Sequence, residues 1–352
     1  MGIGSRIGQR EPSLCGQQSV VRPQLTVRRM TDRSIIVAGE TLVDFIPATA
    51  GPLGEVESFA RRAGGAPANV AVGLTRLDTN PWLCTNLSTD GFGDFLASTL
   101  EDEGVPDRFV TRSDHPTALA FVSHDRSGDR SFTFFREDTA DVHIGTDDVD
   151  EGTLSDVGWL VVGGVALTDD PSRSAVFDLA ERARDAGCRV VFDPNTRADL
   201  WSEDPTPTIE RMLSLTDVLK ATPEDFEPTG VPVDEEAFGQ RLLEAGPDTV
   251  LVTRGAAGAR AVAGPDAPWG AGEWSHEGYE LDDVVDATGA GDAFLAGALT
   301  AMVDGSDPTE TLGFANAVAA VSTTESGAMA ALPDRETVER FRDRQDGDGD
   351  GT

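Results

Sequence analysis

The chain has 352 residues and a formal net charge of −34, with 28 lysine and arginine residues against 62 aspartate and glutamate residues. The electrostatic field of this negative charge repels phosphate, so nucleic acid and anionic membrane surfaces are poor partners. Hydrophobic residues make up 39% of the chain and lie in organised runs, which excludes a disordered protein. Lys220 is the only lysine. A carboxylate-rich surface nearly free of lysine resembles the proteins of salt-loving organisms.

Residues 1–30 differ in composition from the rest, with five arginines and one acid. They contain no continuous apolar stretch of the kind that a secretory signal needs. Two interpretations stay open: a disordered basic leader, or a true start at Met30. We favour the start at Met30, because the first strand is predicted directly after it.

Residues 336–352 are predicted to form a solvated acidic tail. The Asp-Gly repeat at its end resembles the beginning of a calcium-binding loop, but the bidentate glutamate that closes such a loop is missing.

The three cysteines and four histidines are few and widely spaced. They form no C-x-x-C pair and no H-E-x-x-H pattern, so we expect neither a disulfide framework nor a cysteine or histidine metal site. No uncharged stretch reaches the roughly 20 apolar residues of a membrane span. We therefore expect a cytoplasmic protein.

In chain order, the apolar patterns first predict a strand at 35–39, a helix at 68–77, a strand at 83–87 and a helix at 92–100. A β-hairpin follows, because two β-rich runs at 119–122 and 131–135 flank a polar turn. Beyond it, strands alternate with helices. The strands are predicted at 159–162, 189–192, 217–219 and 249–253, and the clearest helices at 174–186, 293–302 and 312–323. This alternation predicts an α/β domain with a mainly parallel sheet and a small β-rich insertion.

The strongest motif is the segment Asp286-Ala287-Thr288-Gly289-Ala290-Gly291-Asp292, which precedes an uncharged helix. Glycine lets the backbone come close to a ligand, and the start of a helix directs free N–H groups outward. Such a terminus binds phosphate or stabilises developing negative charge. Asp292 lies where that charge forms, which favours a proton acceptor over a phosphate binder. In isolation the motif would equally suit a glycine-rich turn with an aspartate cap.

A second glycine-rich segment, Gly64-Gly65-Ala66-Pro67-Ala68-Asn69, also precedes a helix. It suits either a tight turn or, with the donor and acceptor groups of Asn69, a polyol site. The two motifs in this order resemble the two signatures of the ribokinase-like (PfkB-type) sugar kinases. The resemblance runs from about residue 35 to residue 333 and is strongest to fructokinases. It is carried further by the segments 39–45, 117–122, 130–136 and 192–197.

The resemblance implies a fold and a reaction. The fold would be ribokinase-like: a mainly parallel sheet with helices on both faces, plus a small β-sheet lid. The kinase domain would span 34–335, with the lid formed from about 45–60 and 112–138. The reaction would be ATP-dependent phosphorylation of fructose. A 2-keto-3-deoxygluconate kinase, a ketohexokinase and a catalytically silent sugar sensor are the alternatives.

The resemblance also implies a role for each matching residue. Asp292 would be the catalytic base, and the backbone of Gly289, Ala290 and Gly291 would form the anion hole. Sugar binding would fall to Asp44, Gly64, Gly65, Asn69, Arg136 and Arg197. Nucleotide binding would involve Lys220, Thr222, Thr253, Gly255, Gly258 and Asn316.

Cofactors and partners follow from the same likeness. ATP and Mg²⁺ would be required, and K⁺ is implied near Asp286 and Thr288, where many relatives hold a monovalent cation. Magnesium would be organised by Asp225 or Glu224, because Thr222-Pro223-Glu224-Asp225 stands where relatives carry an Asn-x-x-Glu run. A homodimer formed through the lid is a further expectation, with no nucleic acid and no membrane partner.

Overall fold

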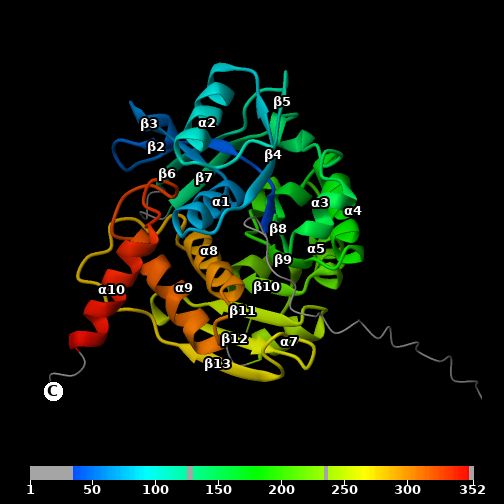
Figure 1. Cartoon of the computed structure of the whole chain (residues 1–352). Coiled ribbons are helices and arrows are strands. Elements are labelled where there is room, and N and C mark those ends of the chain that lie inside the picture. Colours follow the sequence, from blue (N-terminus) through cyan, green and yellow to red (C-terminus); the bar gives the residue numbers. More distant parts are fainter. Residues whose placement is uncertain (1–34, 125–129, 234–236, 349–352) are drawn as a thin grey trace, which may run out of the picture.

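The computed structural model of the chain describes residues 35–124, 130–233 and 237–348, which Figure 1 shows as ribbons. Residues 1–30, for which a leader or a later start was predicted, lie outside the described residues. So do the last residues of the Asp-Gly repeat.

A nine-stranded sheet forms the centre of the described part of the chain, in the order β13-β12-β11-β10-β9-β8-β1-β4-β5. The strands from β5 to β11 run parallel, and β12 and β13 continue the sheet antiparallel. Their bounds are β1 Ile35–Ala38, β4 Trp82–Ser88, β5 Phe109–Ser113, β8 Trp159–Gly163, β9 Arg189–Asp193, β10 Val218–Ala221, β11 Thr249–Thr253, β12 Ala259–Ala263 and β13 Gly272–His276. The mainly parallel sheet is confirmed, whereas the antiparallel edge was not predicted.

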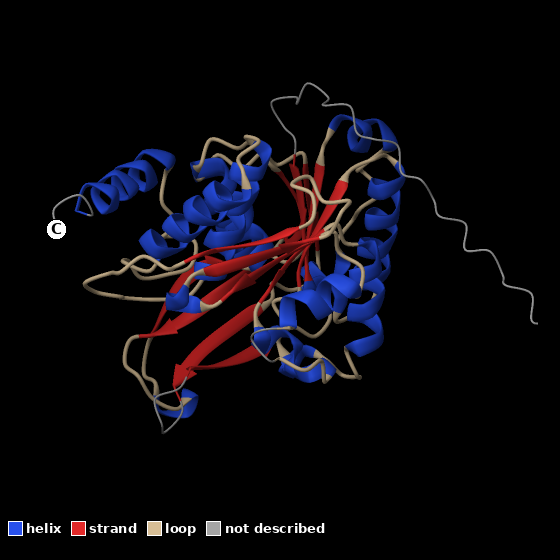
Figure 2. Cartoon of the chain, turned by 90° about the horizontal axis from the view of Figure 1, so that it is seen from below, coloured by secondary structure: helices blue, strands red, loops and turns tan. Residues whose placement is uncertain are grey.

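Helices cover both faces of this sheet (Figure 2), so its inner strands are buried on both sides and are mainly apolar. All four residues of β1 and all seven of β4 are buried. The helices are α1 Ala66–Arg76, α2 Gly91–Asp102, α3 Glu151–Asp156, α4 Ser172–Asp185, α5 Thr206–Leu215, α6 Pro223–Phe226, α7 Phe238–Glu244, α8 Ala290–Val303, α9 Pro308–Ser322 and α10 Arg335–Asp348. Within the described ranges, no helix combines the length and the apolarity that crossing a membrane requires.

A separate four-stranded sheet lies beside the main domain, in the order β3-β2-β6-β7. Its strands are β2 Leu42–Pro47, β3 Phe59–Gly64, β6 Leu119–His124 and β7 Arg130–Phe135. β2 pairs parallel with β6, and the other two pairings are antiparallel. This small sheet, called the lid sheet below, matches the predicted β-rich insertion.

Helix α8 lies at the centre of the molecule, between α1 and α9. It is apolar on all sides because it is buried on all sides: every residue from Asp292 to Ala301 is buried. It begins at Ala290, three residues earlier than predicted, since Gly289 takes the left-handed conformation (φ 80°) as its N-cap. Asp292 therefore lies in the first turn of the helix.

The end of the chain differs from the predicted solvated tail. Residues 335–348 form α10, which packs on α9. Val338 is fully buried and Phe341 is 8% exposed. Arg342 forms two hydrogen bonds with Glu310 of α9, at 2.7 and 2.8 Å. The acidic composition of this segment predicted a solvated tail, but Val338 and Phe341 are spaced so that both lie on one face of a helix.

Candidate active site

A cavity of about 360 Å³ opens at the carboxyl edge of the parallel sheet, where it faces the lid sheet. Ligand sites in open α/β sheets lie at this edge, and the volume is in the usual range for small-molecule sites. Glu40 follows β1, Asn195 follows β9 and Lys220 lies near the end of β10, and all three line the cavity. Asp44 of β2 and Phe132 and Phe134 of β7 line it from the lid sheet.

The first turn of α8 forms one wall of this cavity. Gly289 is required there, because a Cβ at this position would lie 2.7 Å from the Cβ of Ala328. The amide of Ala290 donates to the carbonyl of Ala287 at 3.2 Å. Gly291 and Asp292 come next, and amides in the first turn have no acceptor within the helix. The predicted anion hole thus lies beside the cavity, although the amide of Ala290 already donates a hydrogen bond within the turn.

Asp292 is buried and is held by a residue from the second glycine-rich segment. Asn69, in α1, donates from Nδ2 to Asp292 Oδ2 at 2.8 Å. Burial raises the pKa of Asp292 above its ordinary value, although the hydrogen bond from Asn69 and the positive charges of Lys220 and Arg197 act in the opposite direction. The carboxyl group therefore faces the cavity in an environment that favours proton uptake.

The residues predicted to bind sugar meet around this aspartate. Asp44, Gly65, Asn69 and Arg197 line the same cavity as Asp292. A side chain at Gly64 would displace the carboxylate of Asp44, since a Cβ there would lie 2.0 Å from Asp44 Oδ2. Burial, with the nearby charge of Asp292, raises the pKa of Asp44 to about 7. The structure thus brings together the two motifs that the sequence analysis singled out.

Arg136 is the exception among the predicted sugar-binding residues. It is buried outside the cavity lining, where its guanidinium forms an ion pair with Asp141. It also donates to Thr168 at 2.6 Å and to Asp169 at 3.1 Å. Through these acceptors Arg136 joins the end of β7 to the segment after β8, while its Nη2 is buried without a hydrogen-bond partner among the described residues.

Lys220 lies deep beside the catalytic turn. Its Nζ donates to Asp193 Oδ1 at 3.0 Å, and it lies 3.1 Å from the point that a Cβ of Gly291 would occupy. Burial alone would lower the pKa of Lys220, but the charges of Asp193, Asp225 and Asp292 outweigh it and raise that pKa. A buried ammonium therefore stands next to the expected anion hole, which supports a local need for this single lysine.

The other residues predicted to bind nucleotide lie along the neighbouring strand ends and outside the cavity lining. Thr253, at the end of β11, lies 3.5 Å from the carbonyl of Ala221 through its Oγ1. Gly255 is exposed, whereas a Cβ on Gly258 would lie 2.2 Å from the carbonyl of His276. Asn316 of α9 is buried and donates to the same carbonyl at 3.3 Å.

The predicted metal residues have different environments. Asp225 closes a capping box at α6: its Oδ2 accepts from the Thr222 amide and hydroxyl at 2.9 and 2.7 Å. Its Oδ1 accepts from the amide of Thr196 at 3.1 Å. Glu224 is exposed. Asp225 therefore joins the segment after β9 to the start of α6. Glu224 is the carboxylate that is exposed to solvent.

Asp286 connects the turn before α8 to the segment that follows α9. Its Oδ1 accepts from the Thr288 amide and hydroxyl at 2.9 and 2.6 Å. Its Oδ2 accepts from the amide of Gly327 at 3.1 Å. The segment after α9 thus lies beside Asp286 and Thr288, the residues near which a monovalent cation was predicted.

Among the lining residues that were not predicted as site residues, two are polar: Glu40 and Asn195. Glu40 is buried, and its Oε1 accepts from the Ala66 amide at 3.2 Å; burial is the main cause that raises its pKa to about 8. Asn195 has a left-handed backbone (φ 37°) and lines the cavity. Both fall within segments that carry the family resemblance, so the signal was present, but only the sheet topology shows that they face the cavity.

Comparison with known proteins agrees with this geometry. The family model described as "pfkB family carbohydrate kinase" matches residues 32–335. The chain belongs to the pfkB family of carbohydrate kinases. This kinase is 35% identical to the fructokinase of Salmonella typhimurium over 315 residues, which cover 86% of this chain and 97% of the relative. It is 33% identical to fructokinase-1 of Zea mays, over 86% of this chain and 95% of that protein.

Solved structures give the same result for the fold of the kinase. The fructokinase of Xylella fastidiosa with bound ATP matches with a TM-score of 0.78 and 31% identity, covering 90% of this chain and 99% of the other. A double mutant of the Vibrio cholerae fructokinase, in a form that binds fructose, ADP and a potassium ion, matches with a TM-score of 0.77 and 31% identity. It covers 89% of this chain and 99% of the other. The ribokinase-like fold is thereby confirmed.

Proposed function

We propose that this pfkB-family kinase transfers the γ-phosphoryl group of ATP to a hydroxyl of fructose in the cytoplasm. The observation that carries the proposal is the position of Asp292, which is buried at the start of α8 and bound by Asn69 within the cavity. The identity to fructokinases supports the choice of sugar. The bound ATP and fructose named for the two solved relatives support the substrate pair.

The chemistry follows from the order of groups along the cavity wall. Asp292 accepts the proton of the attacking hydroxyl, and the first-turn amides of α8 with the Lys220 ammonium stabilise charge on the transferred group. Phosphoryl transfer requires mainly positioning and charge neutralisation, which this arrangement supplies. Phe132 and Phe134 bring apolar surface from the lid sheet to the cavity, and excluding water there disfavours ATP hydrolysis.

Of the two carboxylates predicted to bind magnesium, Glu224 fits the ion and Asp225 does not. Mg²⁺ commonly uses one or two carboxylates together with waters and substrate phosphates. Glu224 is exposed and would hold the ion, whereas both oxygens of Asp225 already accept hydrogen bonds. The ion would neutralise phosphate charge. We also retain the expectation of K⁺ beside Asp286 and Thr288, supported by the potassium ion named for the Vibrio cholerae relative.

The cavity favours a neutral sugar over the sugar acid of a 2-keto-3-deoxygluconate kinase. That alternative needs two arginines for a carboxylate, but Arg136 is paired with Asp141 and lies outside the cavity. Glu40, Asp44 and Asp292 line the cavity, so an anionic substrate would face carboxyl groups. A neutral polyol gives these groups hydroxyl donors to bind instead.

A substrate panel tests the proposal. Purified protein in molar KCl with ATP and Mg²⁺ is assayed for ADP release with fructose, glucose, ribose and 2-keto-3-deoxygluconate. NMR of the product then shows which hydroxyl carries phosphate. We expect fructose to give the highest kcat/KM. Turnover with another sugar alone would overturn the choice of fructose, and no sugar-dependent turnover at all would favour a silent sensor.

A homodimer formed through the lid sheet is the remaining expectation. Phe135 on the edge strand β7 is 56% exposed, which provides apolar surface for such a contact. Light scattering of the wild type and of Phe135→Ser tests it. We expect a dimer that the substitution weakens, and a monomeric wild type would contradict the expectation.

A further inference from the structure

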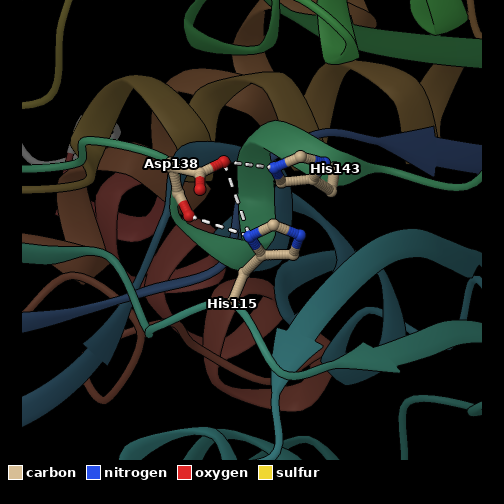
Figure 3. A group of neighbouring side chains, drawn as sticks. All are labelled: His115, Asp138 and His143. Carbon is tan, nitrogen blue, oxygen red and sulfur yellow. Dashed lines mark hydrogen bonds and ion pairs between the residues drawn. The ribbon is translucent and has the colours of Figure 1, made fainter.

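Three side chains with metal-ligating atoms meet where the lid hairpin joins the main domain (Figure 3). His115 lies between β5 and β6, just before the hairpin begins. Asp138 and His143 lie just after β7, where the hairpin ends. Figure 3 shows both imidazoles turned toward the carboxylate of Asp138. The cavity described above is lined by other residues, so this cluster is a separate feature.

The cluster bears on one prediction, because the fold brings together side chains that are far apart in the sequence. From spacing alone, no histidine metal site was expected. The hairpin β6–β7 returns the chain to its starting point, however, and so brings residues 138–143 back to residue 115. Their ligand atoms lie within 4.8 Å of one another. A hydrogen bond from the amide of Ala140 to the carbonyl of Pro116, at 2.9 Å, joins the two segments.

The distances show one carboxylate oxygen facing two imidazoles. His143 Nε2 lies 2.7 Å from Asp138 Oδ1, and His115 Nδ1 lies 3.5 Å from the same oxygen. The two rings stack at 3.6 Å between centroids, with 14° between their planes. His115 Nδ1 also lies 3.2 Å from the backbone carbonyl of Asp138, so each ring has a hydrogen-bond partner on Asp138. A cation between the three groups would replace these hydrogen bonds and bind both ring nitrogens and the carboxylate once the stacked rings tilt toward it.

The donor set selects the kind of cation. Two neutral imidazole nitrogens and one carboxylate oxygen suit Zn²⁺ and its first-row neighbours, whereas Mg²⁺ and Ca²⁺ prefer oxygen ligands throughout. The side chains of His115, Asp138 and His143 are 35%, 72% and 28% exposed. This exposure lets an ion enter and leaves room for a water as the fourth ligand.

We propose that His115, Asp138 and His143 bind one Zn²⁺ ion through Nδ1, a carboxylate oxygen and Nε2. The ion joins the segment entering β6 to the segment leaving β7, and so holds the base of the lid hairpin. Because β7 carries Phe132 and Phe134 to the cavity, the ion stabilises the lid sheet without contacting substrate. The proposal does not depend on which sugar the enzyme phosphorylates.

Zinc binding by the full chain tests the site. The metal-free protein is titrated with ZnCl₂ against a chromophoric chelator, in KCl and excess Mg²⁺ so that carboxylate-only sites are occupied. We expect one tight equivalent in the wild type. His143→Ala and Asp138→Asn should each lower the affinity for Zn²⁺. The loss should be at least as large as the roughly 10–100-fold that removal of an outer-shell partner costs. Asp147→Asn, an exposed aspartate nearby, is the matched control and should bind as the wild type does.

Two further measurements make the outcome decisive. Co²⁺ added in place of Zn²⁺ should give a visible d–d absorption band in the wild type that both site variants lack. Zn²⁺ should raise the Tm of the wild type and of Asp147→Asn only, because an ion that binds the native state stabilises it. If His143→Ala fails to fold, the exposed Asp138→Asn decides the matter. Absence of a tight equivalent in the wild type, or its survival in folded site variants, would overturn the proposal.

Discussion

Asp292 and Asn69 are 223 positions apart and form a 2.8 Å hydrogen bond. The amide of Asn69 donates to one carboxylate oxygen and orients the other. Around them, Glu40 and Asp44 add carboxyl groups whose pKa values burial raises to about 8 and about 7. At the scale of single residues the cavity therefore holds two acids, Glu40 and Asp44, that exchange protons near neutral pH, beside Asp292, whose pKa burial also raises.

Replacing Asp292 by asparagine tests its role. The Asp292→Asn variant keeps the size of the side chain but lacks a proton acceptor, so we expect kcat to fall by roughly 10²-fold or more. Sugar binding, measured by calorimetry, should persist. Asp102→Asn, at an exposed position of α2, is the control and should retain wild-type kcat. Near-normal turnover of Asp292→Asn would remove the base from the mechanism.

Glu40 gives a pH-dependent contribution to stability. Its pKa is raised from 4.5 to about 8 in the folded protein, so folding favours the protonated form. This contribution is fully present below pH 4.5 and is lost as the pH rises through about 8. Glu40→Gln stays neutral throughout. We expect the Tm of the ligand-free wild type to fall relative to Glu40→Gln across this interval.

The matched control for this comparison is Glu101→Gln at an exposed position of α2. Its Tm should follow that of the wild type at every pH. A constant difference in Tm between the wild type and Glu40→Gln would show that Glu40 is not buried in its neutral form.

At the scale of elements, α10 carries a contribution that its composition does not suggest. Phe341 packs edge-on against Tyr279, with ring centroids 5.1 Å apart, and belongs to the same core cluster as α8 and α9. We expect Phe341→Ala to lower the free energy of unfolding by about 3 kcal/mol, in the lower part of the range for buried phenylalanines. Glu339→Ala on the exposed side of α10 should change it by less than about 0.5 kcal/mol. Equal denaturation midpoints for the two variants would show that α10 is indeed a dispensable tail.

Most elements were predictable because parallel strands are buried on both faces and therefore read as mainly apolar runs. The strands β1, β4, β8 and β11 and the helices α1, α4, α8 and α9 follow from this pattern and its helical counterpart. Gly65, Asn69 and Asp292, which line the cavity, could be singled out because a glycine-rich turn before a helix is a local signal.

The remaining contacts depend on distant pairing, which no local pattern encodes. No local sequence pattern shows that Arg136 is buried and paired. Only the fold places Asp141 and Asp169 around it. Asp225 was read as a metal ligand, although it caps α6 and binds the Thr196 amide. The cluster of His115, Asp138 and His143 forms only when the lid hairpin closes. Each depends on which segments the topology brings together.

At the scale of the whole molecule, the net charge of −34 is a destabilising self-repulsion that salt screens. The screening length falls to about 3 Å at 1 M salt. We expect the Tm to rise steeply between low salt and molar KCl, as the likeness in composition to proteins of salt-loving organisms also suggests. Full stability and activity at low salt would contradict this halophilic character.

Choline chloride at the same ionic strength separates screening from specific binding. Stability should follow ionic strength whichever salt is used. A higher kcat in KCl than in choline chloride at the same ionic strength would support a monovalent cation beside Asp286 and Thr288. Equal kcat in both salts would argue against it.

Because the only lysine of the chain is buried against Asp193 with 5% of its side chain exposed, the native surface carries no accessible ε-amine. Reagents that acylate amines are therefore expected to spare Lys220 in the folded protein. Acylation of Lys220 then reports that β10 has opened. The lysine proposed to stabilise charge on the transferred group is thus also a built-in chemical probe of unfolding.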